Sequence, residues 1–238
     1  MDDIIGRSES CAIVGWEEGS AGQIHTWIEK QGYHIACFVH ADDTPPVIEK
    51  IHRDSTQFSY PENGSFKNKL FLCSTRWFDK IKELGITKVL VTTDDMQKRH
   101  LQIEQAKSAS LKLLNAIHPT VTIMEDARIG ENVIIHAHAF IGYRTEIGNG
   151  AIINTGAQLD HHNVIRECAT IDPGVVFAGN VTVGRFTRVH TAATVINRIC
   201  IGENCIIGAG SVIIKDVQND VTVVGVPGRI IKKKGERV

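Results

Sequence analysis

Two adjacent histidines, His161 and His162, follow Asp160 in the stretch 153–165, which reads INTGAQLDHHNVI. An imidazole exchanges protons near neutral pH, so such a pair can provide a general base for a nucleophile that must lose a proton. The alternative interpretation is that both are exposed polar residues on a turn of a structural repeat. Which of the two interpretations holds depends on the secondary-structure elements that position the two imidazoles.

An apolar residue stands at every sixth position from Ile123 to Ile213, sixteen times without a break. This period fits neither an α-helix nor a coiled-coil heptad. A small residue often stands two positions before the apolar one, and glycine often follows it. The pattern predicts a parallel β-helix in which three hexapeptides form one triangular coil, with about five coils in total. The recurring residues are Ile123, Ile129, Ile135, Ile141, Ile147, Ile153, Leu159, Ile165, Ile171, Phe177, Val183, Val189, Val195, Ile201, Ile207 and Ile213.

This register places the two histidines. Leu159 is an inward-pointing residue, so positions 160–162 form a corner of the prism. We therefore expect His161 and His162 to face outward, and we expect Ile153, Ile171 and Phe177 to lie in the core.

The chain changes character near His118-Pro119. Before this point, apolar runs at 11–15, 34–39, 70–74, 88–93 and 111–117 alternate with helical patterns at 21–32, 77–85 and 95–107. This βαβ alternation predicts a Rossmann-like α/β domain of residues 1–117, with ligands at the carboxyl ends of its parallel strands. The β-helix domain then spans residues 118–238, and the region from the 40s to the 60s, with DDTPP and SYPENGS, is expected to form an irregular excursion.

Composition excludes several classes of protein. The 238 residues are 42% hydrophobic and 22% charged with a net charge of −1, and the largest basic run is Lys232-Lys233-Lys234, so we expect no nucleic-acid partner. Without a long apolar run or a basic leader, we expect a cytoplasmic protein that does not insert into membranes. The six cysteines lack C-x-x-C spacing, so we expect reduced thiols rather than disulfides or zinc ligands.

The segment from about Leu114 to Lys234 resembles the left-handed β-helix (hexapeptide-repeat) acyltransferases in motifs such as ARIGENVII, INTGAQLDHHNVI and IGENCIIGAGSVIIKDV. The whole chain is similar to the sialic acid O-acetyltransferase-like family, which includes bacterial N-acetyltransferases for nucleotide-linked amino sugars of the bacillosamine and perosamine type. This resemblance implies a homotrimer that transfers an acetyl group from acetyl-CoA to a 3- or 4-amino-deoxy sugar for a surface polysaccharide or glycoprotein glycan, without a metal. Two alternatives remain: O-acetylation of sialic acid or a related sugar, and a catalytically silent relative that only binds sugar nucleotides.

The resemblance also implies roles for the residues of the stretch. Relatives carry a histidine base between two acidic residues, and His161 occupies its place. His162 replaces the following carboxylate, so we expect His162 to orient His161 by a hydrogen bond and Asp160 or Glu167 to supply negative charge. Thr170 stands where relatives have a histidine near the acyl group.

The resemblance also assigns further residues of this chain to the acyl-CoA site. Asn154 matches an asparagine between acyl-CoA and acceptor, although asparagine also suits a left-handed corner. Gly179 matches a glycine whose N–H faces the thioester carbonyl, and Thr191 and Ala209 match residues along the pantetheine arm. The basic residues near the end of the chain contact either CoA phosphates or only solvent: Lys215, Arg229, Lys232 and Lys233.

The acceptor is expected at the first domain. A glycine-rich turn that leads into a helix suits a phosphate. Relatives have two acids after the second strand, where this chain has His40 and, two residues later, Asp42. The residues expected to bind the nucleotide sugar are Gly15, Gly19, Gly22, His40, Asp42 and Thr93.

Overall fold

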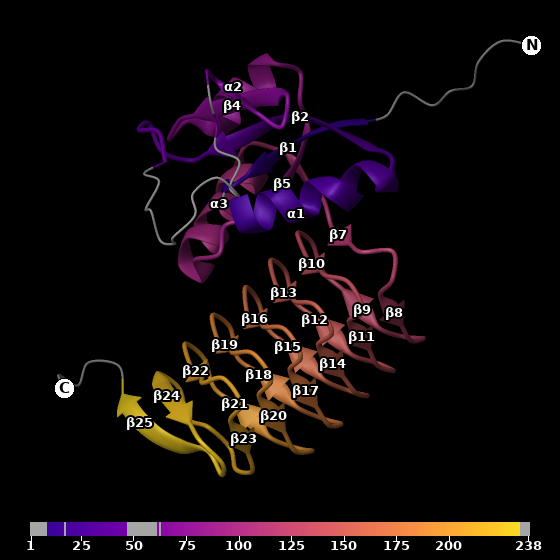
Figure 1. The fold of residues 1–238 in the computed structure, drawn as a ribbon, viewed down its shortest axis with the longest axis vertical. Helices are drawn as coiled ribbons and strands as arrows, with labels where there is room; N and C mark the ends of the chain where they lie inside the picture. Colours follow the sequence, from indigo (N-terminus) through magenta and orange to yellow (C-terminus); the bar gives the residue numbers. More distant parts are fainter. Residues whose placement is uncertain (1–8, 17, 47–60, 62, 234–238) are drawn as a thin grey trace, which may run out of the picture. The chain divides into compact units, whose positions relative to one another are not determined.

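The computed structural model describes residues 9–16, 18–46, 61 and 63–233 (Figure 1). The chain divides into two compact units, Met1–Leu114 and Asn115–Val238. The boundary lies three residues before the predicted one, because Ala116 and Ile117 already pair with Ile134 and Ile135 in the repeat.

The first unit contains the predicted parallel sheet. Its strand order is β3-β4-β2-β1-β5-β6, and every neighbouring pair is parallel except β3 with β4. Part of the predicted excursion, residues 47–60 and 62, lies outside the described residues. The elements are β1 (Glu9–Val14), α1 (Glu18–Ile28), a 3₁₀ turn (Glu29–Gln31), β2 (Tyr33–His40), β3 (Ser65–Phe66), β4 (Lys69–Cys73), α2 (Trp77–Glu83), β5 (Lys88–Val91), α3 (Met96–Ser108) and β6 (Lys112–Leu113).

Local chemistry explains where the helices of this unit begin and end. Asp95 accepts a hydrogen bond from the Lys98 N–H at 2.8 Å and so caps the start of α3. Gly32 closes the turn after α1 at φ 90°, a conformation that suits glycine. None of the described helices has the length and apolar character that crossing a bilayer requires.

The second unit is a prism of short strands with three faces, and all of its strand pairs are parallel except the last pair on the first face (Figure 1). The first face holds β7 (Ala116–Ile117), β10 (Ile134–Ile135), β13 (Ile152–Ile153), β16 (Thr170–Ile171), β19 (Arg188–Val189), β22 (Ile206–Ile207), β24 (Val221–Val224) and β25 (Arg229–Lys233). The second face holds β8 (Thr122–Ile123), β11 (Phe140–Ile141), β14 (Gln158–Leu159), β17 (Val176–Phe177), β20 (Thr194–Val195) and β23 (Val212–Ile213). The third face holds β9 (Arg128–Ile129), β12 (Glu146–Ile147), β15 (Val164–Ile165), β18 (Thr182–Val183) and β21 (Cys200–Ile201).

Residues eighteen positions apart lie next to each other in successive coils. Ile153, for example, pairs with Ile171, and Ile171 pairs with Val189. The inward residues from Ile135 to Ile213 are at most 3% exposed, which confirms the predicted register. The prediction is wrong for Ile123, which is 41% exposed, because β8 ends its face and has a neighbouring strand on one side only.

Three corners join the faces and recur every eighteen residues. In one coil, the first corner is 154–157, the second is 160–163 and the third is 166–169. From Asp126 to Gly210, every sixth residue turns a corner with φ between 53° and 68°. The turning residue is often Gly or Asn, as predicted, but His162, Phe186 and Arg198 also take this conformation. Coils approach so closely that a Cβ on Gly142 would lie 2.6 Å from the Asp160 carbonyl carbon.

The register makes a prediction for two neighbours in β17. Phe177 points into the prism and is 1% exposed, whereas Val176 points outward and is 38% exposed. We expect Phe177→Ala to lower the free energy of unfolding by about 3–5 kcal/mol, because it leaves a cavity. Val176→Ala, the control, should lower it by less than about 1 kcal/mol, as for most surface changes. Urea unfolding of both variants measures this, and equal losses would mean that the register is wrong.

Candidate active site

The two histidines lie exposed at the second corner, as predicted. His161 Nδ1 is 3.0 Å from His162 Nδ1, and the two rings are nearly perpendicular. A hydrogen bond between two imidazole nitrogens needs one proton, so one Nδ1 donates and the other accepts. When His161 is the donor, its Nε2 has a free lone pair and can take a proton from a nucleophile.

The two carboxylates considered as charge partners do not contact the His161 ring. Asp160 Oδ1 accepts the backbone N–H of His161 at 2.8 Å, so this carboxylate caps the turn. Glu167 belongs to the third corner. Among the side chains that the structure describes, His162 is the one hydrogen-bonded to the His161 ring.

Buried polar side chains hold the second corner in place. Asn163 Nδ2 donates to the Asp160 carbonyl at 2.6 Å, and the Thr145 hydroxyl donates to the same oxygen at 3.0 Å. Asn163 Oδ1 accepts the Val181 N–H at 2.7 Å, which joins the corner to the next coil. Asn163 and Thr145 were not predicted from the sequence. The signal was available, because both stand two positions before an inward residue, where most coils carry a small apolar residue.

Gly179 lies directly against His161. A Cβ at this position would collide with Cε1 and Nε2 of the His161 ring, so only glycine allows the imidazole to lie over the backbone of the next coil. Gly179 is buried, and within the described residues its N–H has no protein acceptor. The structure therefore brings two predicted residues together and leaves a backbone donor available beside an imidazole.

A hollow of about 510 Å³ lies on the second face and reaches this corner. Asp160 and Ala178 line its edge, while Val176 and Ile196 supply exposed apolar surface. A ligand with an apolar part can therefore pack beside the corner that carries His161.

The remaining residues predicted for acyl-CoA lie elsewhere on the prism. Thr170 is buried in β16 on the first face, and Asn154 is half-buried at the first corner. Thr191 and Ala209 are exposed at the same corner in later coils. In one chain, the predicted residues thus form one group at the first corner and another at the second. Of the basic residues near the end of the chain, all are exposed: Lys215, Arg229, Lys232 and Lys233.

The first corner also holds charged residues that the sequence analysis missed. Asp172, at the position equivalent to Asn154 in the next coil, accepts hydrogen bonds from Asn154, Arg188 and His190. The spacing of eighteen residues from Asn154 to Asp172 and from Asp172 to His190 was visible in the sequence.

In the first unit, Gly15 and Thr93 meet at the carboxyl edge of the sheet. Gly15 has φ 87°, and a Cβ there would lie 2.6 Å from the Thr93 nitrogen. The Thr92 hydroxyl donates to the Gly15 carbonyl at 2.9 Å and joins the two strand ends. The predicted glycine-rich loop is shorter than expected. Gly19 and Gly22 lie inside α1, which begins at Glu18.

His40 ends β2, and Asp42 follows it. Burial lowers the pKa of His40, and Lys98 contributes in the same direction against the opposing effect of Asp42. The Thr44 N–H and hydroxyl donate to Asp42 and lower the pKa of its carboxyl group. At neutral pH this edge therefore presents a neutral imidazole beside an ionised carboxylate.

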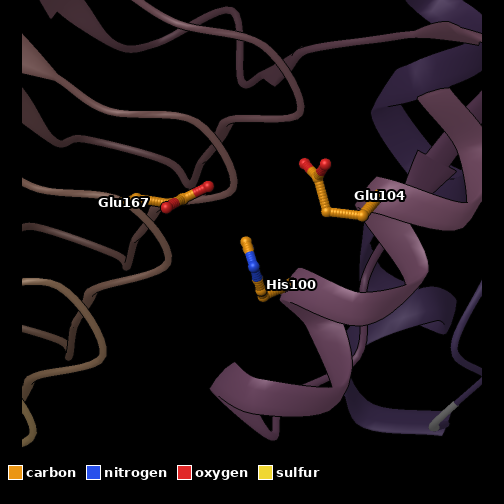
Figure 2. Close-up of side chains that lie close together, drawn as sticks. All are labelled: His100, Glu104 and Glu167. Atoms are coloured by element: carbon orange, nitrogen blue, oxygen red, sulfur yellow. The ribbon is translucent and has the colours of Figure 1, made fainter. Parts of the chain in front are cut away.

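Figure 2 shows His100 and Glu104 on α3, together with Glu167 of the second unit. His100 and Glu104 stand four residues apart and face the same side of the helix. Two ligands from one helix are too few for a structural metal site, so we assign no metal to them.

No protein-family model matches the chain. Among solved structures, a His-to-Asn variant of perosamine N-acetyltransferase from Caulobacter crescentus, in complex with CoA and GDP-perosamine, is 27% identical. It covers 94% of this chain and 97% of that chain with a TM-score of 0.82. The acetyltransferase domain of PglB from Neisseria gonorrhoeae FA1090, in complex with acetyl coenzyme A, shares the fold at 24% identity. It covers 94% of this chain and 100% of that chain with a TM-score of 0.78.

Curated relatives match the repeat over a shorter range. A serine acetyltransferase from Synechococcus elongatus is 36% identical over 130 residues, which are 54% of this chain and 49% of that protein. One from Bacillus subtilis is 32% identical over 124 residues, or 49% of this chain and 55% of that protein. The chain thus spans about half the length of the curated relatives it matches. The chain thus shares the fold of perosamine N-acetyltransferase and of the PglB acetyltransferase domain, and its hexapeptide coils are similar in sequence to those of serine acetyltransferases.

Proposed function

We propose that the chain is an acyl-CoA-dependent N-acetyltransferase that acts on a nucleotide-linked 3- or 4-amino-deoxy sugar for a surface polysaccharide or glycoprotein glycan. The observation that carries this proposal is the likeness to perosamine N-acetyltransferase, which extends over both units. The serine acetyltransferases match about half of this chain, which is less than the range of the amino-sugar enzyme.

His161 is the general base of the proposed reaction. Its Nε2 takes a proton from the acceptor amine while the amine nitrogen attacks the thioester carbon. The carbon–sulfur bond then breaks, and the thiolate takes the proton from the His161 imidazolium, so that CoA leaves as its thiol and the base is regenerated. His162 accepts the Nδ1–H of His161 and so holds the tautomer that this step needs.

Gly179 provides the electrostatic part of the mechanism. Its available N–H beside the imidazole is suited to the oxyanion that forms when the amine adds to the carbonyl. The same glycine has no side chain that would displace His161. Gly179 therefore serves both groups, because it supplies the oxyanion donor and leaves room for the ring of the base.

The carboxyl edge of the first sheet binds the nucleotide part of the acceptor in this proposal. Gly15 and Thr93 form its tight floor, while His40 and Asp42 supply an imidazole and a hydrogen-bond acceptor. Ligands of open parallel sheets bind at this edge as a rule.

We further propose that three copies associate and that the first corner of one copy completes the site at the second corner of its neighbour. The separation of the predicted residues into two groups on one chain supports this arrangement. The exposed apolar side chains of Val176 and Ile196 on the second face provide surface for such contacts.

The activity can be tested with acetyl-CoA and a panel of GDP-, UDP- and dTDP-linked 3- and 4-amino sugars, with free thiol as the readout. We expect thiol release with one amino sugar and a product that survives mild base, because amides resist hydrolysis that cleaves esters. A base-labile product would favour O-acetylation. No thiol release with any amino or hydroxyl acceptor would favour the silent relative.

The two histidines should differ in their effects on rate. We expect His161→Ala to lower kcat by about 10²–10⁴-fold, the usual contribution of a general base, with little change in acyl-CoA affinity. His162→Ala should lower kcat much less. His162→Glu should stay active and move the acid limb of the kcat/KM profile to higher pH, because a carboxylate stabilises the imidazolium. The assignment is wrong if His162→Ala is the inactive protein and His161→Ala the mild variant.

A composite site predicts complementation between two impaired variants. We expect the protein to have a light-scattering mass near three times 26.2 kDa. In random mixed trimers of His161→Ala and Asn154→Ala chains, about one quarter of the sites pair two intact corners, so activity should rise above that of either variant. A mixture of His161→Ala and His161→Gln chains is the control and should stay inactive. Failure of the first mixture to recover activity, despite subunit exchange, would place the whole site within one chain.

A further inference from the structure

A network of polar side chains surrounds a buried carboxylate at the first corner. Asp172 has a side chain that is only 6% exposed. Its Oδ2 accepts from Arg188 Nε at 3.0 Å and lies 2.9 Å from His190 Nδ1, while its Oδ1 accepts from Arg188 Nη2 at 3.2 Å and Asn154 Nδ2 at 3.3 Å. We call these four residues the Asp172 network.

The carboxylate determines which atoms its neighbours present to the outside. An ionised carboxylate only accepts hydrogen bonds, so Asn154 must turn its NH₂ group toward Asp172 and His190 must carry its proton on Nδ1. The free atoms are then Asn154 Oδ1 and His190 Nε2. The amide oxygen accepts hydrogen bonds, and Nε2 accepts them when the imidazole is neutral. Arg188 is engaged with the same carboxylate, which balances its charge locally.

The position of the network makes these acceptors available. The His190 side chain is 39% exposed and Asn154 is half-buried. They stand two coils apart, roughly 10 Å along the prism at the usual strand spacing. The second face, with its hollow, leads from this corner to the corner of His161.

We propose that the Asp172 network makes the first corner a recognition site for hydrogen-bond donors of the ligand, with Asn154 Oδ1 and His190 Nε2 as the accepting atoms. The donors are amino or hydroxyl groups of the acceptor sugar, or amide N–H groups of the pantetheine arm. This assignment rests on the proposed function, because it places a substrate of that reaction at the corner. Asp172 acts as a positioning residue, and His190 contacts the ligand.

The first experiment examines the tautomer without any turnover. Nitrogen-15 NMR of the labelled protein, recorded at a pH where the imidazole is neutral, should show His190 with a protonated Nδ1 and a bare Nε2, and the signal is assigned by its loss in His190→Phe. Asp172→Asn should abolish this preference, because an amide can donate as well as accept. A wild-type His190 with its proton on Nε2 would overturn the proposal.

The second experiment measures binding. In Asp172→Asn, KM for the acceptor sugar or Kd for CoA by calorimetry should rise roughly three- to tenfold, the effect of losing about one hydrogen bond, with a smaller change in kcat. The ligand that weakens identifies the source of the donors. His190→Phe leaves the Asp172–Arg188 pair intact and should weaken the same ligand, which keeps the test valid if Asp172→Asn folds poorly.

Asp126→Asn is the matched control. Asp126 pairs with Arg144 eighteen residues later, but this ion pair is exposed. Its loss should leave both affinities unchanged. The proposal fails if neither ligand weakens in the Asp172 and His190 variants, or if Asp126→Asn weakens them equally. If the wild type transfers no acetyl group to any acceptor, the proposed function fails. The NMR spectra and the CoA titration still test whether the Asp172 network forms a recognition site at the first corner.

Discussion

The left-handed backbone conformation at every sixth residue is the constraint on which the second unit depends. Each such residue turns the chain by one face, so three turns close a coil and bring residue i next to residue i+18. For residues other than glycine this conformation costs roughly 1–2 kcal/mol. The hydrogen bonds between coils and the burial of the inward side chains, from Ile135 to Ile213, offset this cost. The repeat is therefore stable only as a stack.

The same constraint explains how the candidate site is built. His162 is itself a turning residue, so its ring is carried outward at the corner and reaches His161 across a single peptide. Gly179 lies eighteen residues after His161 and is therefore its neighbour in the next coil. Asn154, Asp172 and His190 follow the same interval at another corner. Side chains that cooperate come from equivalent positions of successive coils, and segments adjacent in sequence supply different corners.

Periodicity made the architecture predictable, because the inward position of each hexapeptide is a local property of the chain. The outward placement of His161 followed from the same count. The Nδ1–Nδ1 contact did not, since it depends on the rotamers of two rings. Asn163 and Asp172 were missed for a related reason, because a polar residue at a corner reads as exposed. In the structure both are buried, with Asn163 bonded to two neighbours and Asp172 to three. In the first unit, the strand pattern predicted the sheet. The start of α1 at Glu18 was not predicted, because Gly19 and Gly22 suggested a loop where the helix already runs.

The interval between His161 and Gly179 has a consequence for how such a chain can change length over evolutionary time. An insertion or deletion of six residues preserves the apolar pattern, yet it rotates everything downstream onto the next face and separates the imidazole from its glycine. A change of eighteen residues returns every downstream residue to its own face, and it leaves His161 beside Gly179 when it falls outside the interval between them. Coils can therefore be gained or lost only as whole turns outside the intervals that join functional positions, whereas the ends of the prism are free of this restriction. Lineages that keep the chemistry should vary in length mainly at the ends and in complete coils.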